Sequence, residues 1–216
     1  MTAACELDHL VVAARDLEQG VRWVEATFGV EIGPGGAHPR MGTHNRLMKI
    51  ADAAFLEVIA VDPAAAAPER PRWYALDDQA VRASLEAAPR LLTWVVRTRA
   101  IAAAVAASPI PLGEIVPASR GALDWHITVP PDGALPAGGV MPTIIQWAED
   151  AAPWTSMADP GCRLEALTLE HPEPARLEAA LAAIGVADAV PVAVRHGARP
   201  GPQARIAAPR GTIKIA

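Results

Sequence analysis

Apolar and polar positions along the chain predict strands and helices in a repeating order. Residues 7–14, LDHLVVAA, are apolar on both faces, which is typical of a strand buried within a sheet. Asp16 is placed to cap a helix that carries an apolar stripe from Leu17 to Phe28, and Gly29 is placed to end that helix. The first 29 residues therefore predict a buried strand followed by a capped amphipathic helix.

Three further strand-like segments follow this helix: VEIGPGG, GTHNRLMKIAD and AFLEVIAVD. Glycine-rich or Asp/Ala turns separate them, as expected of neighbouring strands. Residues 1–62 are therefore predicted to form a βαβββ module. The proline-rich stretch DPAAAAPERPRW cannot continue a sheet, so we place a linker and connecting segment over residues 63–90.

The same order of elements recurs later in the chain. LLTWVVRT repeats the buried strand and RAIAAAVAAS the helix, and three strand-like segments complete a second βαβββ module over residues 91–150. RLEALTLEHPEPARLEAALAAIG begins a third repeat, which predicts a partial βαβ-type module over residues 151–216. Because each module leaves one sheet face bare, the modules are expected to pack together as one domain of the α+β class.

Composition and charge narrow the range of functions. The chain has 216 residues, of which 51% are hydrophobic, so it can form a large core. Its net charge is -5, with acidic and basic residues interspersed, which disfavours nucleic acid as a partner. We expect small-molecule ligands.

The same composition bears on location. The acidic start of the chain and the prolines Pro109 and Pro111 in its longest apolar stretch predict a cytoplasmic protein with no membrane contact. Cys5 and Cys162 lie far apart in the sequence, so reduced thiols are expected.

Several motifs carry a resemblance to a known family: LDHLVVAARDLEQGVRW, GTHNRL, FLEVIAV, RWYALDD and LTLEHPEPARLEAAL. Over nearly the whole chain these segments resemble the glyoxalase-like domain proteins of the vicinal oxygen chelate superfamily. The resemblance implies two βαβββ modules that form a cupped mixed sheet around a small-molecule cavity, with helices on the outside. It also implies a divalent metal bound by a histidine on the first strand and a glutamate on the fourth, positions held here by His9 and Glu57.

The residues support a special role for this pair independently. Glu57 alternates with Phe55 and Ile59 in a strand that otherwise reads as buried, where an unpaired charge is very costly. An imidazole and a carboxylate on one concave face suit a divalent cation. A His9–Glu57 hydrogen bond, or solvation in a wet cavity, is the alternative, and the residues leave both open.

The second and third repeats depart from the family's ligand pattern. Aligned by strand order, Thr93 takes the place of His9 and Gln146 the place of Glu57, which offers one poor ligand and one neutral amide oxygen. In the third repeat Glu165 or Ala166 corresponds to His9, depending on register, and GTIKIA contains no glutamate. We therefore expect Thr93 and Gln146 to contact substrate, and the third repeat to be structural or to form a lid.

A second histidine is a candidate for catalysis. In ALDWHITVP the apolar residues share one face, so if that face packs under the helix, His126 looks into the cavity as an extra ligand or a general base. A hydrogen-bonded or exposed strand histidine is the alternative.

Candidate substrate contacts also come from the first module and from a loop. Aligning Gly42 with Gly121 places Asn45 on the cavity face and His44 on the helix side, and a register slip of one residue would exchange them. Trp73 lies in a loop and is free to line a pocket, whereas core packing accounts better for Trp94 and Trp147.

These predictions support one function and two alternatives. The first is a glyoxalase-like lyase or isomerase, monomeric or homodimeric, in which Glu57 and His126 are catalytic and a metal at His9 and Glu57 polarises vicinal oxygens of the substrate. The alternative is a non-catalytic protein that binds and sequesters a small molecule, as bleomycin-resistance-like relatives do. An extradiol-type dioxygenase ranks lower, because His126 would have to supply its second histidine.

Overall fold

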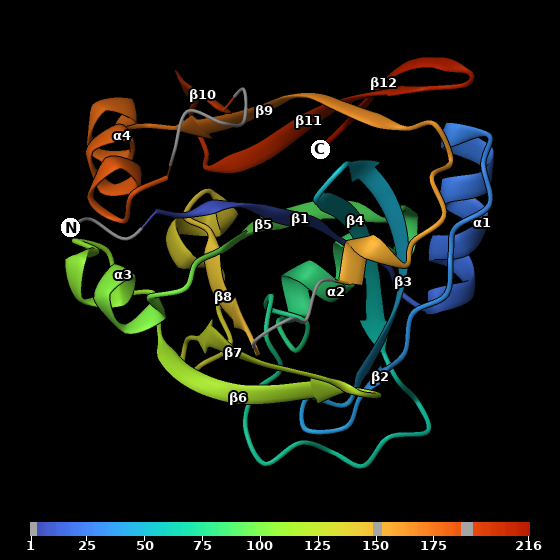
Figure 1. The fold of residues 1–216 in the computed structure, drawn as a ribbon, viewed down its shortest axis with the longest axis horizontal. Coiled ribbons are helices and arrows are strands. Elements are labelled where there is room, and N and C mark those ends of the chain that lie inside the picture. Colours follow the sequence, from blue (N-terminus) through green and yellow to red (C-terminus); the bar gives the residue numbers. More distant parts are fainter. Residues whose placement is uncertain (1–3, 149–152, 187–191) are drawn as a thin grey trace.

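A computed structural model gives the arrangement of residues 4–148, 153–186 and 192–216 (Figure 1). It contains an eight-stranded sheet and, above it in Figure 1, a four-stranded sheet. No helix among these residues is long and apolar enough to cross a membrane. Cys5 and Cys162 are both buried free thiols, as predicted.

The first half of the eight-stranded sheet follows the predicted βαβββ order. The Asp16 carboxylate accepts a hydrogen bond from the Gln19 amide at 2.7 Å, and the first helix ends at Gly29, whose φ is 73°. Both helix boundaries are thus confirmed. The elements of this half are β1 (Glu6–Ala13), α1 (Leu17–Phe28), β2 (Ala37–His38), β3 (Thr43–Ala51) and β4 (Ala54–Val61).

The second half repeats that order after a connecting segment. This segment contains a helix, α2, within the predicted linker of residues 63–90. The elements are α2 (Gln79–Ala87), β5 (Arg90–Arg97), α3 (Ile101–Ala107), β6 (Glu114–Arg120), β7 (Leu123–Val129) and β8 (Thr143–Trp147), with short 3₁₀ helices at Pro136–Gly139 and Pro153–Thr155.

The strand order of the large sheet, β2-β3-β4-β1-β5-β8-β7-β6, relates its two halves by an approximate two-fold axis. β1 pairs with β4, and β5 with β8, in parallel, whereas β1 and β5 pair antiparallel across the axis. The edge strands β2 and β6 also lie close to each other (Figure 1). The sheet is therefore a nearly closed cup, and the predicted fold class is confirmed.

The four-stranded sheet comes from the third repeat. Its elements are β9 (Arg163–His171), α4 (Pro174–Ala183), β10 (Val192–His196), β11 (Gly201–Ala208) and β12 (Gly211–Ile215). The order is β10-β9-β11-β12, so β9 lies between two strands of its own repeat, unlike β1 or β5.

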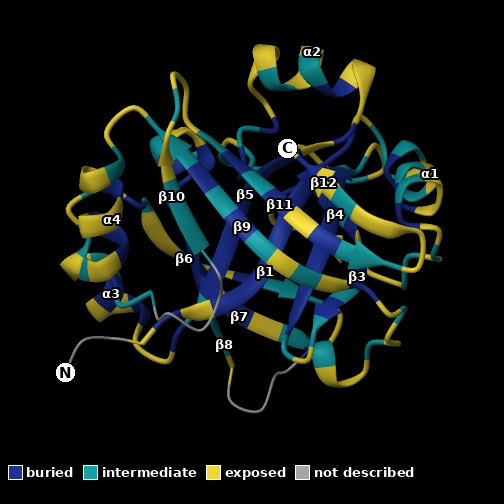
Figure 2. Cartoon of the chain, turned by 90° about the horizontal axis from the view of Figure 1, so that it is seen from above, coloured by how far each residue is buried: buried dark blue, intermediate teal, exposed yellow. Residues whose placement is uncertain are grey.

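The two sheets share one core. In Figure 2 the small sheet crosses above the strongly buried strands β1 and β4. Leu10 and Trp94 on the outer face of the large sheet pack with Leu167 and Ile206 of the small one. The opposite, inner face of the large sheet is left for the cavity.

One predicted strand is wrong. Residues 30–36, VEIGPGG, contain only an isolated bridge between Gly33 and Leu47, and β2 begins after them. A side chain at Gly35 would place its Cβ 2.0 Å from the Asn45 carbonyl oxygen, so the glycines serve a close approach to β3 rather than a strand. The predicted strands at 142–150 and 190–196 extend into residues outside the described part of the chain.

Candidate functional site

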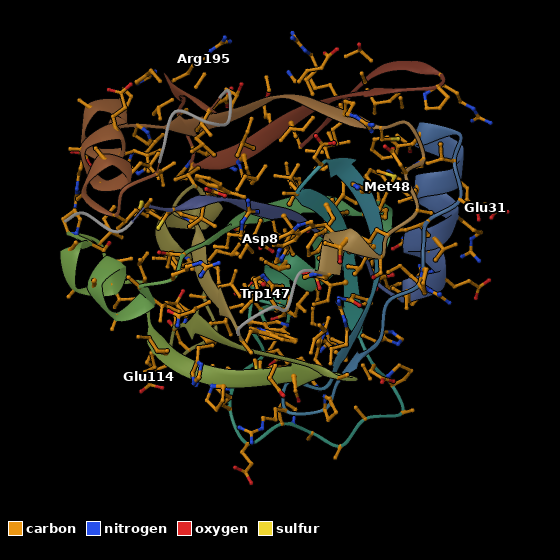
Figure 3. All side chains as sticks on the ribbon, viewed as in Figure 1. Asp8, Glu31, Met48, Glu114, Trp147 and Arg195 are labelled. Atoms are coloured by element: carbon orange, nitrogen blue, oxygen red, sulfur yellow. The ribbon has the colours of Figure 1, made fainter. Side chains whose placement is uncertain are left out.

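A chain of hydrogen-bonded polar side chains starts on the second half of the cup and continues along the inner face of the first half. It begins at Trp147 of β8, whose indole Nε1 donates to Asp8 Oδ2 at 2.8 Å. Figure 3 shows Asp8 and Trp147 together in the interior, between the outer elements of the cup. Asp8 Oδ1 lies 2.6 Å from His9 Nδ1, and His9 Nε2 lies 3.5 Å from Glu57 Oε2.

A bulge in β1 explains how Asp8 and His9 reach the same side. Neighbouring residues of a strand normally point to opposite faces. Here the pairing with β5 shifts between Leu7 and His9, which leaves Asp8 without a partner residue in the ladder. A bulge re-aims side chains in this way, so Asp8 can hold the His9 ring from the side. Phe55 stacks on that ring at a centroid distance of 4.6 Å.

On the other side of His9, Glu57 is held by a neutral network. Asn45 Nδ2 donates to Glu57 Oε1 at 2.5 Å, and Asn45 Oδ1 accepts from the Gly36 amide at 3.0 Å. The same Nδ2 lies 3.3 Å from His38 Nε2, and His38 Nδ1 lies 3.0 Å from Thr43 Oγ1. An amide NH₂ can only donate, so this network assigns the His38 proton to Nδ1. Glu57 Oε2 has no hydrogen-bond partner among the described residues.

The two buried histidines, His9 and His38, have pKa values shifted in opposite directions. Burial disfavours charge on His9, but its contacts with Asp8 and Glu57 outweigh burial and raise the pKa of His9 to about 9. Burial alone would raise the pKa of Glu57, yet the contact with His9 and its charge lower it to about 2. Burial dominates at His38 and lowers its pKa to about 4. At neutral pH the site thus holds an imidazolium, a carboxylate and a neutral imidazole.

The cavity around these groups is small and mostly aromatic. Its volume is about 20 Å³, which is enough for about one water molecule. Trp73 and Tyr74 cover it, and Tyr74 has a φ of 57°, a strained value for a residue with a side chain. The remaining lining residues are His9, His38, Phe55, Glu57, Arg120, Trp125, Ile127, Ile145 and Trp147.

Three of the predicted site positions meet in this cavity. His9 and Glu57 form its polar floor, and Trp73 lines it, stacked edge-on against His38 at a centroid distance of 5.1 Å. Asn45 lies directly behind Glu57, on the predicted face of β3. The structure thus brings together the predicted residues of the first half and the predicted loop tryptophan.

The predicted residues of the second half lie elsewhere. His126 is exposed, whereas its neighbours Trp125 and Ile127 line the cavity, so the predicted face of β7 is wrong. Gln146 Oε1 accepts from the Ile101 amide at the start of α3, outside the cup. Thr93 is buried and donates to the Gly139 carbonyl at 3.1 Å without lining the cavity.

A register error of three residues explains the two reversed faces. His9 pairs with Val95, and Val11 pairs with Thr93. The two-fold axis exchanges these two pairs, so Thr93 is the symmetry counterpart of His9, as predicted. The pairs Val11–Glu57 and Val95–Thr143 then make Thr143 the counterpart of Glu57. Gln146 stands three positions further on, and an odd offset moves a strand's side chains to the other face.

The same offset applies to β7. Asn45 pairs with Ile59 and Ile127 pairs with Ile145, so Ile127 is the counterpart of Asn45. The alignment of Gly42 with Gly121 is thus three residues short. That alignment exchanged the polar and apolar faces of β7. The offset in β8 likewise led to the prediction of Trp147 in the core, whereas it lines the cavity.

Sequence reasoning missed Asp8, His38, Tyr74 and Arg120. Asp8 lies at a bulge, His38 in a two-residue strand and Tyr74 in a strained loop. None of these features produces a periodic pattern in the sequence. Arg120 ends β6, and no signal in the sequence set it apart from the other arginines.

The donor set does not fit a resident divalent metal. The orphaned Glu57 Oε2 and the nearby His9 Nε2 are two suitable donors, and Asp8 orients the imidazole as a metal site would require. However, the counterpart positions are Thr93 and Thr143, and no group of three His, Cys, Asp or Glu side chains suited to a metal exists among the described residues. Two strong ligands fall short of the three or four of a stable site.

Comparison with known proteins identifies the family. The sequence model of the glyoxalase-like domain matches residues 7–185. The chain belongs to the glyoxalase-like domain family. The predicted resemblance of this glyoxalase-like protein to glyoxalase-like domain proteins is therefore confirmed. No curated protein matches the chain.

One solved structure agrees with this chain at the level of the fold, and two further matches have lower scores. A hypothetical protein from Staphylococcus aureus is 12% identical, with a TM-score of 0.61 over 91% of this chain and 88% of that chain. Methylmalonyl-CoA epimerases from Streptomyces coelicolor and Mycobacterium tuberculosis are 18% and 19% identical, with TM-scores of 0.43 and 0.41. These cover 68% and 65% of this chain, and 99% and 85% of their own chains.

Proposed function

We propose that this glyoxalase-like protein is a small-molecule isomerase or lyase that transfers a proton at a carbon next to a carbonyl group. The observation that carries the proposal is the pair His9 and Glu57 on the floor of a small, mostly aromatic cavity. The carboxylate has one oxygen free of hydrogen bonds, and the imidazolium points its Nε2 toward the same space. The two groups are a proton acceptor and a proton donor at neutral pH.

The chemistry uses these two groups in complementary roles. Glu57 Oε2 takes the proton of the substrate C–H bond, whose electron pair becomes the double bond of an enolate. The Nε2 proton of His9 stabilises the negative charge on the enolate oxygen. An isomerase returns the proton from Glu57 to carbon at a new position or face, whereas a lyase completes the reaction by expelling a leaving group from the neighbouring carbon.

The surrounding residues support these roles by position. Asp8 fixes the His9 ring and keeps it protonated, and Asn45 holds Glu57 Oε1 so that Oε2 is the oxygen that reacts. Contact with His9 weakens Glu57 as a base in the free protein. A substrate oxygen that takes over the His9 proton removes part of that contact and so strengthens Glu57 at the moment it is needed.

Binding without chemistry is the second candidate. Trp73, Tyr74, Trp125 and Trp147 form aromatic walls that would hold a flat apolar ligand, which favours the sequestration alternative. A protein that only sequesters a ligand does not need an ion pair in the floor, and it would exchange no protons with that ligand.

Deuterium exchange tests the proposal and separates the two candidates. The protein is incubated in D₂O with 2-butanone, hydroxyacetone or 2-oxobutyrate, and ¹H NMR follows loss of the signal beside the carbonyl. We expect exchange above the protein-free rate for at least one compound, and a rate about 100-fold lower in Glu57→Gln. This variant keeps the shape of Glu57 and can still contact Asn45.

The matched control is Glu69→Gln, an exposed glutamate in the connecting segment, which should exchange at the wild-type rate. Exchange that persists unchanged in Glu57→Gln would contradict the proposal. Saturable binding of these compounds with no exchange in the wild type would favour sequestration instead.

A further inference from the structure

Arg120 occupies the seam of the cup, where its two edge strands approach each other. It is the last residue of β6, and its side chain crosses toward the segment that leads into β2. A Cβ added at Gly36, just before β2, would lie 2.8 Å from Arg120 Cγ. Gly36 therefore makes room for the arginine stem at the one place where the sheet is not closed by hydrogen bonds between strands.

This arginine lines two cavities. It belongs to the wall of the small cavity above His9 and Glu57. It also lines a groove of about 1000 Å³ on the outside, formed by residues 30–35, β3, the start of β7 and residues 153–160. Arg120 is the single residue common to both linings among the described residues, so the groove and the small cavity lie on its two sides.

Arg120 is half-buried, yet it has no hydrogen bond or ion pair with any described residue. Burial lowers the pKa of Arg120, and the carboxylates of Glu57 and Asp8 partly offset this from a distance. A guanidinium still keeps its proton in proteins, so a cation with unused donors faces the cavities.

The other partly buried arginines each make hydrogen bonds, although Arg70 Nε has no partner among the described residues. Arg70 binds Glu114 and the Val129 and Pro130 carbonyls, Arg72 binds Asp77 and the Gly42 carbonyl, and Arg97 binds Glu6 and the Leu7 and Ala53 carbonyls. Among the described residues Arg120 is thus the one partly buried arginine whose guanidinium makes no hydrogen bond, and its nitrogens stay accessible to a ligand.

We infer that Arg120 binds the carboxylate of an anionic substrate, whose carbonyl and reacting carbon then face His9 Nε2 and Glu57 Oε2 after the cavity has widened from its volume of about 20 Å³ to admit them. This inference rests on the proposed function and names its substrate class: small monocarboxylates with a carbonyl next to a C–H bond, such as 2-oxo acids. The planar guanidinium matches a carboxylate with two parallel hydrogen bonds. A phosphate dianion fits less well, because Arg120 is the only arginine at the small cavity among the described residues and Glu57 would repel the second charge.

A binding titration tests the inference separately from catalysis. Tryptophan fluorescence reports binding because Trp73, Trp125 and Trp147 line the small cavity. The probes are 2-oxobutyrate and its neutral relative 2-butanone. We expect the Kd of 2-oxobutyrate to rise about tenfold or more in Arg120→Gln, with a smaller rise in Arg120→Lys, which keeps the charge but loses the planar fork. The Kd of 2-butanone should not change.

The matched control is Arg199→Gln, which removes the same charge from an exposed position away from both cavities and should bind 2-oxobutyrate as the wild type does. Because Arg120 has no hydrogen bond or ion pair to lose among the described residues, Arg120→Gln should also keep the wild-type unfolding midpoint. Inorganic phosphate is the competitor: displacement of 2-oxobutyrate by phosphate at equal concentration would overturn the choice of a carboxylate.

The outcomes distinguish this site from the proposed function. Equal Kd values for 2-oxobutyrate in the wild type and Arg120→Gln, or no saturable binding in the wild type, would overturn the inference, even if Glu57-dependent exchange of a neutral compound is found. Arg120-dependent binding without any deuterium exchange would leave the carboxylate site standing and overturn the proton-transfer function.

Discussion

The two halves of the large sheet share a backbone arrangement but differ in chemistry. In the first half, His9, Glu57 and Asn45 face inward as a connected polar network. Their symmetry counterparts in the second half are Thr93, Thr143 and Ile127. The halves therefore fold in the same way although only one of them carries ionisable groups at these positions.

This difference indicates what the fold requires and what it does not. Both halves need buried strands, and threonine or isoleucine meets that need without any charged partner. Histidine and glutamate at the same depth cost free energy unless each is paired. The first half retains them together with Asp8 and Asn45, which supply the pairing. We interpret the first half as the reacting wall of the cavity and the second half as a wall that is mainly aromatic and aliphatic, with Arg120 as its one charged residue among those described.

The largest expected effect comes from one substitution made at counterpart positions. His9→Val leaves the Asp8 and Glu57 carboxylates buried without the cation between them, which should lower the free energy of unfolding by about 3–5 kcal/mol. Thr93→Val loses the hydrogen bond of its hydroxyl to the Gly139 carbonyl and a longer one to the Trp94 carbonyl, about 1 kcal/mol. Urea denaturation at neutral pH measures both. Losses of equal size would contradict the assigned difference between the halves.

A smaller effect is expected where the second half does contribute to the network. Trp147→Phe removes the indole N–H that donates to the Asp8 carboxylate, which should cost about 1.5–3 kcal/mol. Trp125→Phe is the matched control, because the Trp125 indole nitrogen has no hydrogen-bond partner among the described residues. Thermal or urea unfolding of the pair should place Trp125→Phe closer to the wild type. The reverse order would show that Asp8 does not depend on Trp147.

The sequence predicted the fold well because its signals were local and repeated. The capped helix α1, the buried strands β1, β4 and β5, and the repetition of modules each follow from patterns within a few residues. The pairing of His9 with Glu57 was also predictable, because two ionisable residues in buried strands must find partners.

The rest of the site depends on the register in which the strands pair, and a single sequence predicts that register poorly. Glycine positions and strand order suggested an alignment of the second half that was three residues off, and that shift alone sent His126 and Gln146 to the wrong face. The bulge at Asp8 and the loop that carries Tyr74 interrupt the alternation of polar and apolar residues, so the sequence pattern could not predict them. Arg120 became notable only when its neighbours in space were known.

The central claim is that His9 is a protonated acid held between Asp8 and Glu57, and a titration of the histidine ring nitrogens by ¹⁵N NMR tests it most directly. The account predicts that at about pH 7.5 both nitrogens of His9 carry protons, that His9 titrates with a pKa near 9, and that His38 stays neutral down to about pH 4. In Glu57→Gln the pKa of His9 should fall, because one of its two carboxylate partners is gone. A neutral His9 at about pH 7.5 in the wild type would contradict the account.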